Sequence, residues 1–457
     1  MGKGFICAFL KQTMRQEDVS MPFGFPFHTA QELYDSVKGP YALPPQGDVA
    51  LLTRPVQGRG FRLKNAMVVQ PMEGCDGTTG GAPTDWTVRR YRRFAAGGAG
   101  LLWMEAVSVD PDARANPCQL MITEDNADDF RRLLEAARKA ADEAGVERPK
   151  IIAQLTHSGR WSRPYDEKRP IRNWTNPVLD PHQNLPADYP VITDGELEAL
   201  PDKFARTARL CMQAGFDGVD VKACHLYLMS EMLGGFDRPG PYGGSYENRT
   251  AIYFACVDAA RAETGDGILA ARINLYDGEA GRWGVGGNLS LDLSEPLRLA
   301  RDLEKRGVVL LNITMGTPYY NPHVNRPYAR GGYEQPENPV DGVARLLYGC
   351  AQAQSAVPDV VCVATGMSYL RQFGPAVAAG LLAQGGARCV GWGRGSFAYP
   401  DFAKDIIERG AMAPEKCCVT CGVCTKIMRQ PTGRPGCPVR DTAWYQPEYQ
   451  RVLGGKK

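Results

Sequence analysis

The chain has 457 residues and a formal net charge of +2, with 44% hydrophobic and 23% charged residues. This length favours one large domain with an appendage, or two domains. The small net charge gives no electrostatic reason to bind nucleic acid or an anionic membrane. No run of 18 apolar residues occurs, and the first 21 residues lack the features of a signal peptide. We therefore expect a cytoplasmic protein with no membrane span and no nucleic-acid partner.

Short apolar runs alternate with amphipathic stretches over most of the chain. Residues 1–60 carry little periodicity and much proline and glycine, and we interpret them as an N-terminal lead-in. The apolar runs lie at residues 66–72, 100–105, 150–155, 218–222, 268–273, 308–314, 359–365 and 388–393. Continuous apolar runs are typical of strands that are covered on both faces, and they indicate a parallel sheet.

Helical patterns separate these runs. The clearest are residues 126–144 and 201–214, each followed directly by glycine, with further candidates at 296–305 and 340–356. Eight strands alternating with helices predict a (β/α)8 TIM barrel, which we assign to residues 61–410. The competing fold, a doubly wound open sheet, would need a glycine-rich fingerprint after the first strand, and the sequence PMEG at 71–74 is not one.

In a TIM barrel, functional residues lie at the C-terminal ends of the strands. Five of the eight ends carry polar groups, whereas a purely structural position would carry small and apolar residues. The residues at the strand ends are Pro71, Met72, Glu105, Ala106, Gln154, His157, Lys222, His225, Arg272, Gly366, Gly393 and Arg394. The glycines and Arg394 follow strands seven and eight, where barrels commonly bind a phosphate through backbone N–H groups.

Five of the 14 cysteines crowd into a basic, proline-rich C-terminal segment, residues 411–457, and the other nine are scattered singly. Cys418, Cys421, Cys424 and Cys437 have the spacing of three close thiolates and a distant fourth, which can ligate one cubane iron–sulfur cluster. A structural zinc site is the alternative, since four cysteines also suit zinc. We expect the adjacent Cys417 not to be a ligand, and the scattered cysteines to be reduced core residues.

Several long motifs resemble the old yellow enzyme family, in particular its iron–sulfur branch, which includes 2,4-dienoyl-CoA reductase and trimethylamine dehydrogenase. The resemblance spans about residues 60–440. The motifs are VVQPMEG (68–74), GGAPTDWTVRRYRRFAAGGAGLLWMEA (80–106), QLTHSGR (154–160), AGFDGVDVKACHLYLMSEML (214–233), PYGGSYENR (241–249), GWGR (391–394) and the terminal cysteines.

The resemblance implies that FMN binds on top of the barrel and that the four cysteines hold a [4Fe–4S] cluster. Pro71, Met72 and Ala106 would lie beside the isoalloxazine ring, and Gln154 would bind its pyrimidine edge. Arg272 would lie by N1 and O2, where a cation stabilises reduced flavin. The phosphate would be held by Gly366, Gly393 and Arg394.

The segment from Lys222 to Tyr227 resembles the family's substrate-polarising stretch, although the family has His or Tyr in place of Lys222. The resemblance implies that Lys222 and His225 hydrogen-bond a substrate carbonyl, flavin N5 delivers hydride to the β-carbon, and Tyr227 protonates the α-carbon. Glu73 is a second departure. A carboxylate disfavours an electron-rich flavin, so we expect its side chain to point elsewhere.

The loop after the sixth strand carries Tyr319, Tyr320 and His323. Two interpretations of these residues are open. They line the substrate pocket, or they are aromatic residues of the loop surface.

The leading hypothesis is an ene-reductase that reduces an activated C=C bond of an unsaturated carbonyl or carboxylate compound in a low-oxygen setting. A steroid, a cinnamate-like acid and a CoA ester all fit. The first alternative is an amine-type dehydrogenase that passes electrons out through the cluster. It is disfavoured because its relatives have Tyr in place of Lys222, whose positive charge would repel an amine. The second alternative is an electron-transfer subunit of a complex.

The resemblance also bears on partners. Larger relatives continue past the cluster into a half that binds FAD or a nicotinamide nucleotide, whereas this chain stops at Lys457. We therefore expect a separate flavoprotein or small carrier as electron donor, with direct reduction by NAD(P)H as the alternative. Self-association into a homo-oligomer is a further implication of the resemblance.

Overall fold

Eight parallel strands form a closed barrel in the computed structural model, which describes residues 25–430 and 432–454. The strands are β3 (Met67–Val69), β4 (Leu101–Ser108), β5 (Lys150–Thr156), β6 (Gly218–Val221), β7 (Ile268–Asn274), β8 (Leu310–Thr314), β9 (Val361–Ala364) and β10 (Cys389–Trp392). Each strand pairs with the next along the chain, and β10 closes the barrel against β3 with Gly391 opposite Val68. The predicted (β/α)8 barrel is confirmed, and the open sheet is excluded.

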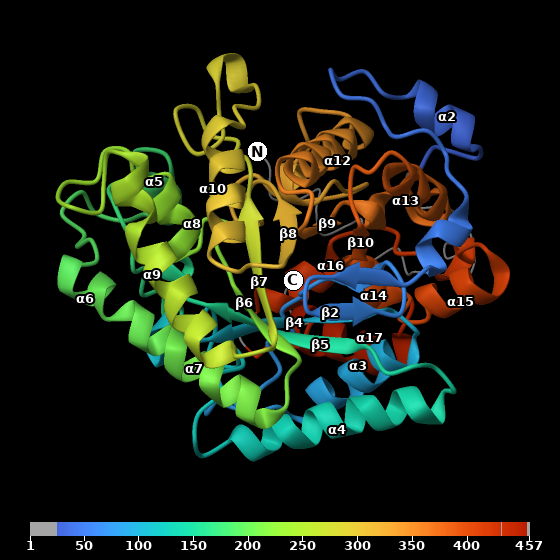
Figure 1. The fold of residues 1–457 in the computed structure, drawn as a ribbon, viewed down its shortest axis with the longest axis horizontal. Helices are drawn as coiled ribbons and strands as arrows, with labels where there is room; N and C mark the ends of the chain where they lie inside the picture. Colours follow the sequence, from blue (N-terminus) through green and yellow to red (C-terminus); the bar gives the residue numbers. More distant parts are fainter. Residues whose placement is uncertain (1–24, 431, 455–457) are drawn as a thin grey trace.

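Helices cover the outside of the barrel (Figure 1). They include α3 (Asp85–Ala96), α4 (Ala127–Glu143), α7 (Leu200–Ala214), α9 (Tyr246–Thr264), α10 (Ser294–Lys305), α12 (Pro339–Ala356), α13 (Gly374–Ala383) and α15 (Phe402–Arg409). The four predicted helices correspond to α4, α7, α10 and α12. The sequence did not predict α9, whose first turn is capped by the side chain of Ser245 accepting from the backbone N–H of Asn248.

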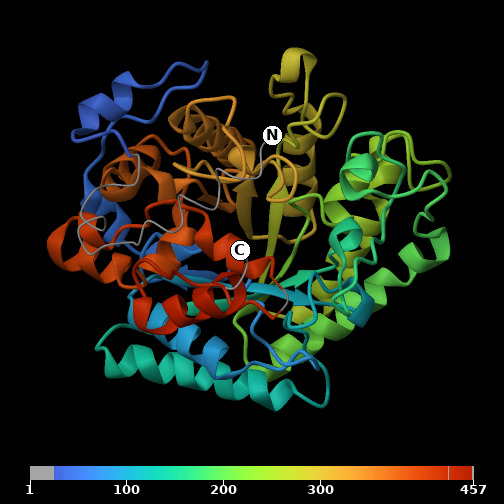
Figure 2. The same ribbon diagram turned by 180° about the vertical axis from the view of Figure 1, so that it is seen from behind.

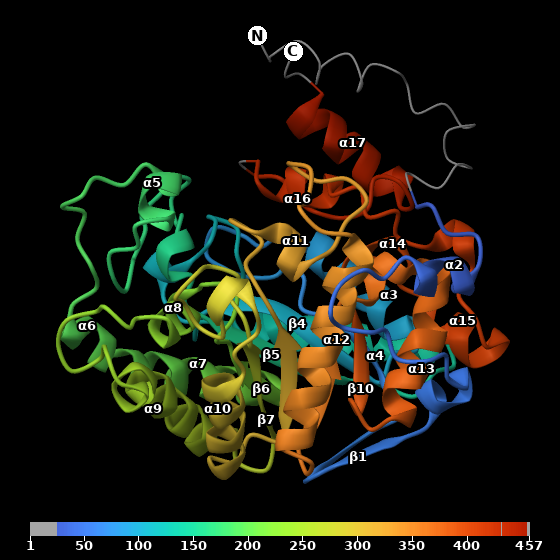
Figure 3. The ribbon, with the colours of Figure 1, turned by 90° about the horizontal axis from the view of Figure 1, so that it is seen from above.

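An antiparallel hairpin of β1 (Val56–Gly58) and β2 (Phe61–Leu63) precedes the barrel and was not predicted. Val56, Phe61 and Leu63 are buried in the same cluster as Val68 and Leu101 near the starts of their strands. The hairpin therefore closes the N-terminal end of the barrel, and Figure 3 shows it on the opposite side of the molecule from the C-terminal helices.

The described part of the lead-in runs along α12 and α13. It contains α2 (Ala30–Asp35) and the 3-10 turn η2 (Val49–Thr53). The backbone N–H of Gly47 donates to the carbonyl of Ala376, 2.9 Å away. Gly380 is required at this contact, because a Cβ there would lie 1.6 Å from the carbonyl oxygen of Pro45.

The C-terminal segment lies over the C-terminal ends of the strands (Figure 2 and Figure 3). It contains α16 (Val423–Met428) and α17 (Thr442–Leu453). Asp441 anchors it to α3, accepting hydrogen bonds from both terminal nitrogens of Arg89 at 2.8 and 3.0 Å and forming a further ion pair with Arg93. The ring of Trp86 meets that of Tyr445 edge-on, at 5.6 Å.

None of the helices within residues 25–430 and 432–454 is long and apolar enough to cross a membrane. The scattered cysteines lie mostly in the core, as expected: Cys211, Cys256, Cys350, Cys362 and Cys389 are all buried. Cys7 lies outside the described residues.

Candidate active site

The loop after β3 is fixed by a buried ion-pair network. Arg90 of α3 is 3% exposed, and it lies between Asp76 and Glu105, 2.6 Å from Glu105. The second oxygen of Glu105 accepts the backbone N–H of Gly74, also at 2.6 Å. Glu105, which the strand-end rule placed among the site residues, therefore holds the loop that carries Pro71, Met72 and Glu73. Gly74 is required here, because a Cβ would lie 2.0 Å from Arg90.

A cavity opens at the C-terminal ends of the strands, and we call it the central cavity. Ten of the predicted flavin-binding and catalytic residues line it. They are Pro71, Met72, Gln154, Lys222, His225, Tyr227, Arg272, Gly366, Gly393 and Arg394. Ala106 is not among the lining residues: it is buried on β4, where its carbonyl accepts a hydrogen bond from Gln119 at 3.1 Å.

Asp220 on β6 organises the floor of the central cavity. Its carboxylate accepts hydrogen bonds from Trp103 Nε1 at 2.7 Å, Gln154 Nε2 at 2.6 Å and the backbone N–H of Arg272 at 2.7 Å. Burial raises the pKa of this carboxyl, against the effect of these donors. The Gln154 amide is held by its nitrogen, so its oxygen is left for a donor in the cavity.

Arg272 itself is a buried cation with little compensation. Its Nε has no hydrogen-bond partner, and no carboxylate of the described residues forms an ion pair with it. Burial lowers its pKa. A buried charge without a partner costs several kcal/mol, roughly, so the geometry calls for an anionic or electron-rich group in the cavity.

A second arginine accompanies Arg394 at the other end of the cavity. Arg326, which follows the short helix α11 (Pro322–Asn325), donates to Thr425 of α16. Burial and the neighbouring Arg394 lower the pKa of Arg326 to about 10. Two guanidinium groups that repel each other beside Gly366 and Gly393 suit an anion such as a phosphate. The sequence prediction missed Arg326, because it lies outside the strand ends and outside the recognised motifs.

The turn after β6 is strained. His225 and Leu226 have φ of 68° and 56°, in the left-handed region that costs about 1–2 kcal/mol for a residue with a side chain. The turn is held by Asn274, which accepts the backbone N–H of His225, and by Thr317, whose hydroxyl donates to the His225 carbonyl. This turn directs His225 and Tyr227 into the central cavity.

The imidazole of His225 is neutral in this setting. Burial, with the charges of Arg272 and Lys222, lowers the pKa of His225 well below its ordinary value. Its Nε2 is buried without a hydrogen-bond partner in the described part of the chain. A neutral imidazole with a free ring nitrogen can bind one polar atom of a ligand.

Lys222, Tyr227 and Glu73 form a compact group. The Lys222 ammonium lies 3.6 Å from the centre of the Tyr227 ring and 3.8 Å from a Glu73 oxygen. The Tyr227 hydroxyl donates to the same Glu73 oxygen at 2.7 Å and lies 2.9 Å from the Tyr319 hydroxyl. Burial lowers the pKa of Lys222 and raises that of Tyr227. Glu73, which we expected to point elsewhere, turns toward the two predicted catalytic residues.

A side cavity adjoins the central one, and Glu73, Tyr319 and Met428 line both. Trp161 forms part of its wall and stacks on Tyr319, with ring centres 4.3 Å apart and planes inclined by 11°. Tyr320 and His323 are not among the residues that line either cavity. Tyr320 packs on His182, and the His323 ring is bound to Tyr333.

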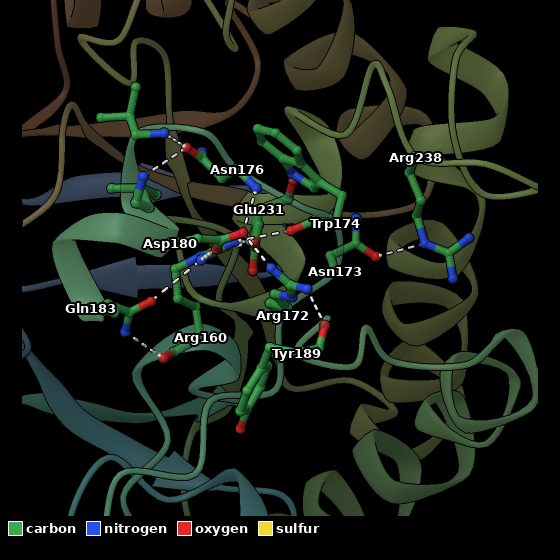
Figure 4. A network of polar contacts seen from close by, with 12 residues as sticks. Arg160, Arg172, Asn173, Trp174, Asn176, Asp180, Gln183, Tyr189, Glu231 and Arg238 are labelled. Atoms are coloured by element: carbon green, nitrogen blue, oxygen red, sulfur yellow. Dashed lines mark hydrogen bonds and ion pairs between the residues drawn. The ribbon is translucent and has the colours of Figure 1, made fainter. Parts of the chain in front are cut away.

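The loop that carries Trp161 is fixed by a second buried network, drawn in Figure 4. Arg160 is fully buried, and it binds Asp180 and donates from Nε to Glu231 at 3.0 Å. Arg172 binds the other oxygen of Asp180. Glu231 belongs to α8 (Leu228–Leu233), which directly follows Tyr227. The network therefore fixes Trp161 and Tyr227 relative to each other.

The four clustered cysteines lie close enough to influence one another. Burial raises the pKa of Cys437, and Cys418, Cys421 and Cys424 add to the shift. The sulfur of Cys418 accepts the backbone N–H of Thr420 at 3.4 Å. The sulfur of Cys417 is directed instead to the Ala413 carbonyl. Within the described residues, no three His, Cys, Asp or Glu side chains are arranged to hold a metal ion.

The amino-acid sequence of this chain is similar to those of known oxidoreductases. The model of the family described as NADH:flavin oxidoreductase / NADH oxidase matches residues 52–285. A metal reductase of Desulforamulus reducens is 28% identical over 358 residues, which are 77% of this chain and 48% of that protein. An NADPH dehydrogenase of Geobacillus sp. is 28% identical over 271 residues, 58% of this chain and 73% of that protein. The chain thus spans about half the length of the metal reductase.

Solved structures share the fold. A 2-naphthoyl-CoA reductase in complex with 2-naphthoyl-CoA superposes with a TM-score of 0.69 at 20% identity, covering 88% of this chain and 58% of that one. Histamine dehydrogenase from Rhizobium sp. 4-9 has a TM-score of 0.64 at 18% identity, covering 86% of this chain and 52% of that one.

Proposed function

Because the chain belongs to the NADH:flavin oxidoreductase / NADH oxidase family, the old yellow enzyme family, we propose that it is an FMN-dependent oxidoreductase that reduces an activated C=C bond. One observation carries the proposal. The buried cation Arg272, whose Nε has no hydrogen-bond partner among the described residues, lies in the same cavity as Lys222, His225 and Tyr227. A site for an electron-rich ring and a set of groups that can bind a carbonyl oxygen are therefore adjacent.

The lining residues fit FMN. Pro71 and Met72 would lie along the ring, the Gln154 oxygen would accept from its pyrimidine edge, and Arg272 would lie by N1 and O2. The phosphate would bind at Gly366 and Gly393 between Arg394 and Arg326. Bound FMN supplies a hydride at N5. Arg272 favours the reduced form, because negative charge collects on that side of the ring.

The substrate would be an unsaturated carbonyl or carboxylate compound. His225 and Lys222 would bind its oxygen, with His225 as a neutral donor. Tyr227 keeps its proton, since burial raises its pKa, and it would deliver that proton to the α-carbon. The amine-dehydrogenase alternative draws on the histamine dehydrogenase neighbour. It is disfavoured by Lys222, whose ammonium would repel an amine cation in the same cavity.

We further propose that Cys418, Cys421, Cys424 and Cys437 hold a [4Fe–4S] cluster. Backbone N–H groups of Thr420, Val423 and Val439 bond the sulfurs of Cys418, Cys421 and Cys437 and oppose the effect of burial, which raises the pKa of all three thiols. Iron bound to these sulfurs would supply the positive charge that stabilises the thiolates. Such a cluster passes single electrons. A separate flavoprotein or small carrier would exchange them, with NAD(P)H as the alternative donor to the flavin.

The first test concerns the reaction. Enzyme photoreduced without oxygen is mixed with a panel of enones and enoates while flavin absorbance is recorded. Rapid return of oxidised flavin with one class, and a saturated product, supports the proposal. If no alkene oxidises the flavin and an amine bleaches the oxidised enzyme, the dehydrogenase alternative replaces it.

The second test concerns the cluster. Protein purified without oxygen is expected to contain iron and acid-labile sulfide in equal amounts. Cys437→Ser should lose both, whereas Cys417→Ser, which changes a cysteine outside the proposed ligand set, should retain them. Zinc without sulfide in the wild type would contradict the assignment.

A further inference from the structure

Resting on the proposed ene-reduction, we propose that Glu73 is the proton relay that recharges Tyr227 from water in the side cavity. Glu73 departs from the pattern of the family motif, and its side chain accepts a hydrogen bond from Tyr227, the proposed proton donor. The proposed relay is the route by which the proton lost to the substrate is replaced.

Tyr227 has few routes to water. The residue is 2% exposed, and within the described chain its hydroxyl has two hydrogen-bond partners, Glu73 at 2.7 Å and Tyr319 at 2.9 Å. The Lys222 ammonium lies over the face of its ring, at 3.6 Å from the centre. A replacement proton therefore reaches the Tyr227 oxygen through Glu73 or Tyr319.

Glu73 is the partner built for this transfer. It lines both cavities, and its side chain is 15% exposed, against 3% for Lys222. A carboxylate can take up a proton and hold it, whereas Tyr319 passes one on only if it receives another at the same time. The groups that face Glu73 are Lys222 and Tyr227 from the end of β6, Tyr319 from the loop after β8, and Cys75 from its own loop. Cys224 and Arg272 lie farther away within its electrostatic reach.

The transfers balance as follows. The β-carbon receives the hydride that reduced flavin supplies, and the α-carbon forms a C–H bond as the Tyr227 O–H bond breaks. This step leaves a Tyr227 phenolate, which is stabilised by the Lys222 cation above its ring. The Glu73 carboxylate takes a proton from a hydronium ion in the side cavity, which becomes water, and passes that proton to the phenolate. Tyr227 is then neutral again beside the Glu73 carboxylate, as at the start.

Glu73→Gln is the matched substitution, because the amide oxygen still accepts from Tyr227 but the side chain no longer carries a transferable proton. FMN affinity is expected to stay within twofold. The first oxidation of reduced flavin by an alkene uses the proton already on Tyr227 and should stay within about twofold of wild type. Steady-state turnover with excess reductant should slow by about a hundredfold, the scale of general acid catalysis, and gain a solvent deuterium isotope effect. The control is Asp166→Asn, the same change at an exposed residue of the side cavity that is paired with Arg163, and its rate should equal that of wild type.

A measurement without turnover tests the same link. With 3-fluorotyrosine at position 227, the fluorine resonance of the oxidised protein should shift with pH, and Glu73→Gln should abolish that shift. An unchanged response of the fluorine resonance to pH in Glu73→Gln, or steady-state turnover within twofold of wild type with the same pH profile, would overturn the relay. If none of the alkenes oxidises the reduced flavin of the wild-type enzyme, the proposed reaction fails. The fluorine titration still decides whether Glu73 and Tyr227 share a proton.

Discussion

Two buried arginines illustrate opposite uses of the same side chain. Arg160 is fully buried between Asp180 and Glu231, so its charge is compensated inside the protein. Arg272 is also buried, at 7% exposed, but its Nε has no partner in the described residues. The first arginine stabilises a loop. The second is expected to lower the stability of the ligand-free protein, a cost that an electron-rich group bound in the cavity would offset.

This contrast gives the first prediction. Arg272→Met should leave the unfolding free energy of the FMN-free protein equal or higher, because an uncompensated charge is removed. It should weaken FMN binding by about 1.5–3 kcal/mol, the value of a hydrogen bond to a charged group. Chemical denaturation and fluorescence titration with FMN measure the two effects. Arg160→Met, the control, should instead lower stability by roughly 3–5 kcal/mol. Equal losses of stability in both variants would contradict the assignment.

Glycine at position 366 provides the second prediction. Gly366 has φ of 102°, and Gly385 has φ of 69° with open space around it. An alanine at either position should cost about 1–2 kcal/mol of stability through backbone strain. Gly366→Ala should also raise the dissociation constant of FMN, because the residue lines the central cavity. Gly385→Ala should not. Thermal unfolding and FMN titration of both variants separate strain from binding.

His157 makes stability depend on pH. Burial lowers the pKa of His157 to about 4, and its Nδ1 accepts the backbone N–H of Gly159. The unfolded chain binds a proton near pH 6.5, and the folded chain does so only near pH 4. Stability is therefore fully present above pH 6.5 and falls as pH drops toward 4, by up to about 3 kcal/mol. Denaturation at pH 7 and pH 5 should show a smaller difference for His157→Gln than for wild type. Equal differences would contradict this origin.

At the scale of elements, the sequence predicted the strands and helices whose apolar residues follow a recognisable pattern. The barrel strands are covered on both faces and appear as continuous apolar runs, and the predicted helices have one apolar face. The β1–β2 hairpin was missed because its three-residue strands are too short to show a period, and their role is set by the barrel end they close. The course of the loops was missed for the same reason. Loop direction depends on long-range contacts such as that of Glu105 with Gly74.

The residues of the candidate site divide in the same way, into those that the sequence pattern predicts and those whose position depends on long-range contacts. The strand-end rule and the motif order identified ten residues that line the central cavity. Arg326 was missed because a helical turn in a long loop brings it there. The direction of Glu73 was unpredictable, since it depends on a hydroxyl 154 residues away along the chain.

Attachment of the C-terminal segment gives the fourth prediction. Asp441→Asn should weaken the contact of this segment with α3 by about 1–3 kcal/mol, because Asp441 is buried and binds both Arg89 and Arg93. Limited proteolysis should then cut residues 411–454 faster than in wild type. Glu143→Gln on α4, which removes a half-exposed pair with Arg92 of α3, should have an effect below about 1 kcal/mol and leave the cleavage rate unchanged. Equal cleavage rates in the two variants would show that Asp441 does not hold the segment.

At the scale of the whole molecule, the fold follows from the number of alternating units more than from any single residue. Eight apolar runs separated by helices require closure into a barrel, and closure brings the C-terminal ends of all strands to one rim. The C-terminal segment covers that rim, with Thr425 and Met428 of α16 lining the central cavity. Closure of the barrel therefore brings residues from distant parts of the chain together in one site.

The pairing of β3 with β10 also has a consequence for synthesis. Met67 lies opposite Val390, 323 positions later in the chain. A ribosome that adds about 5–20 residues per second takes roughly 16–65 s to make the intervening stretch. Throughout that time the outer edge of β3 has no partner strand, and an unpaired edge is a template for association with other chains. The nascent protein is therefore expected to depend on chaperones until its last strand leaves the ribosome.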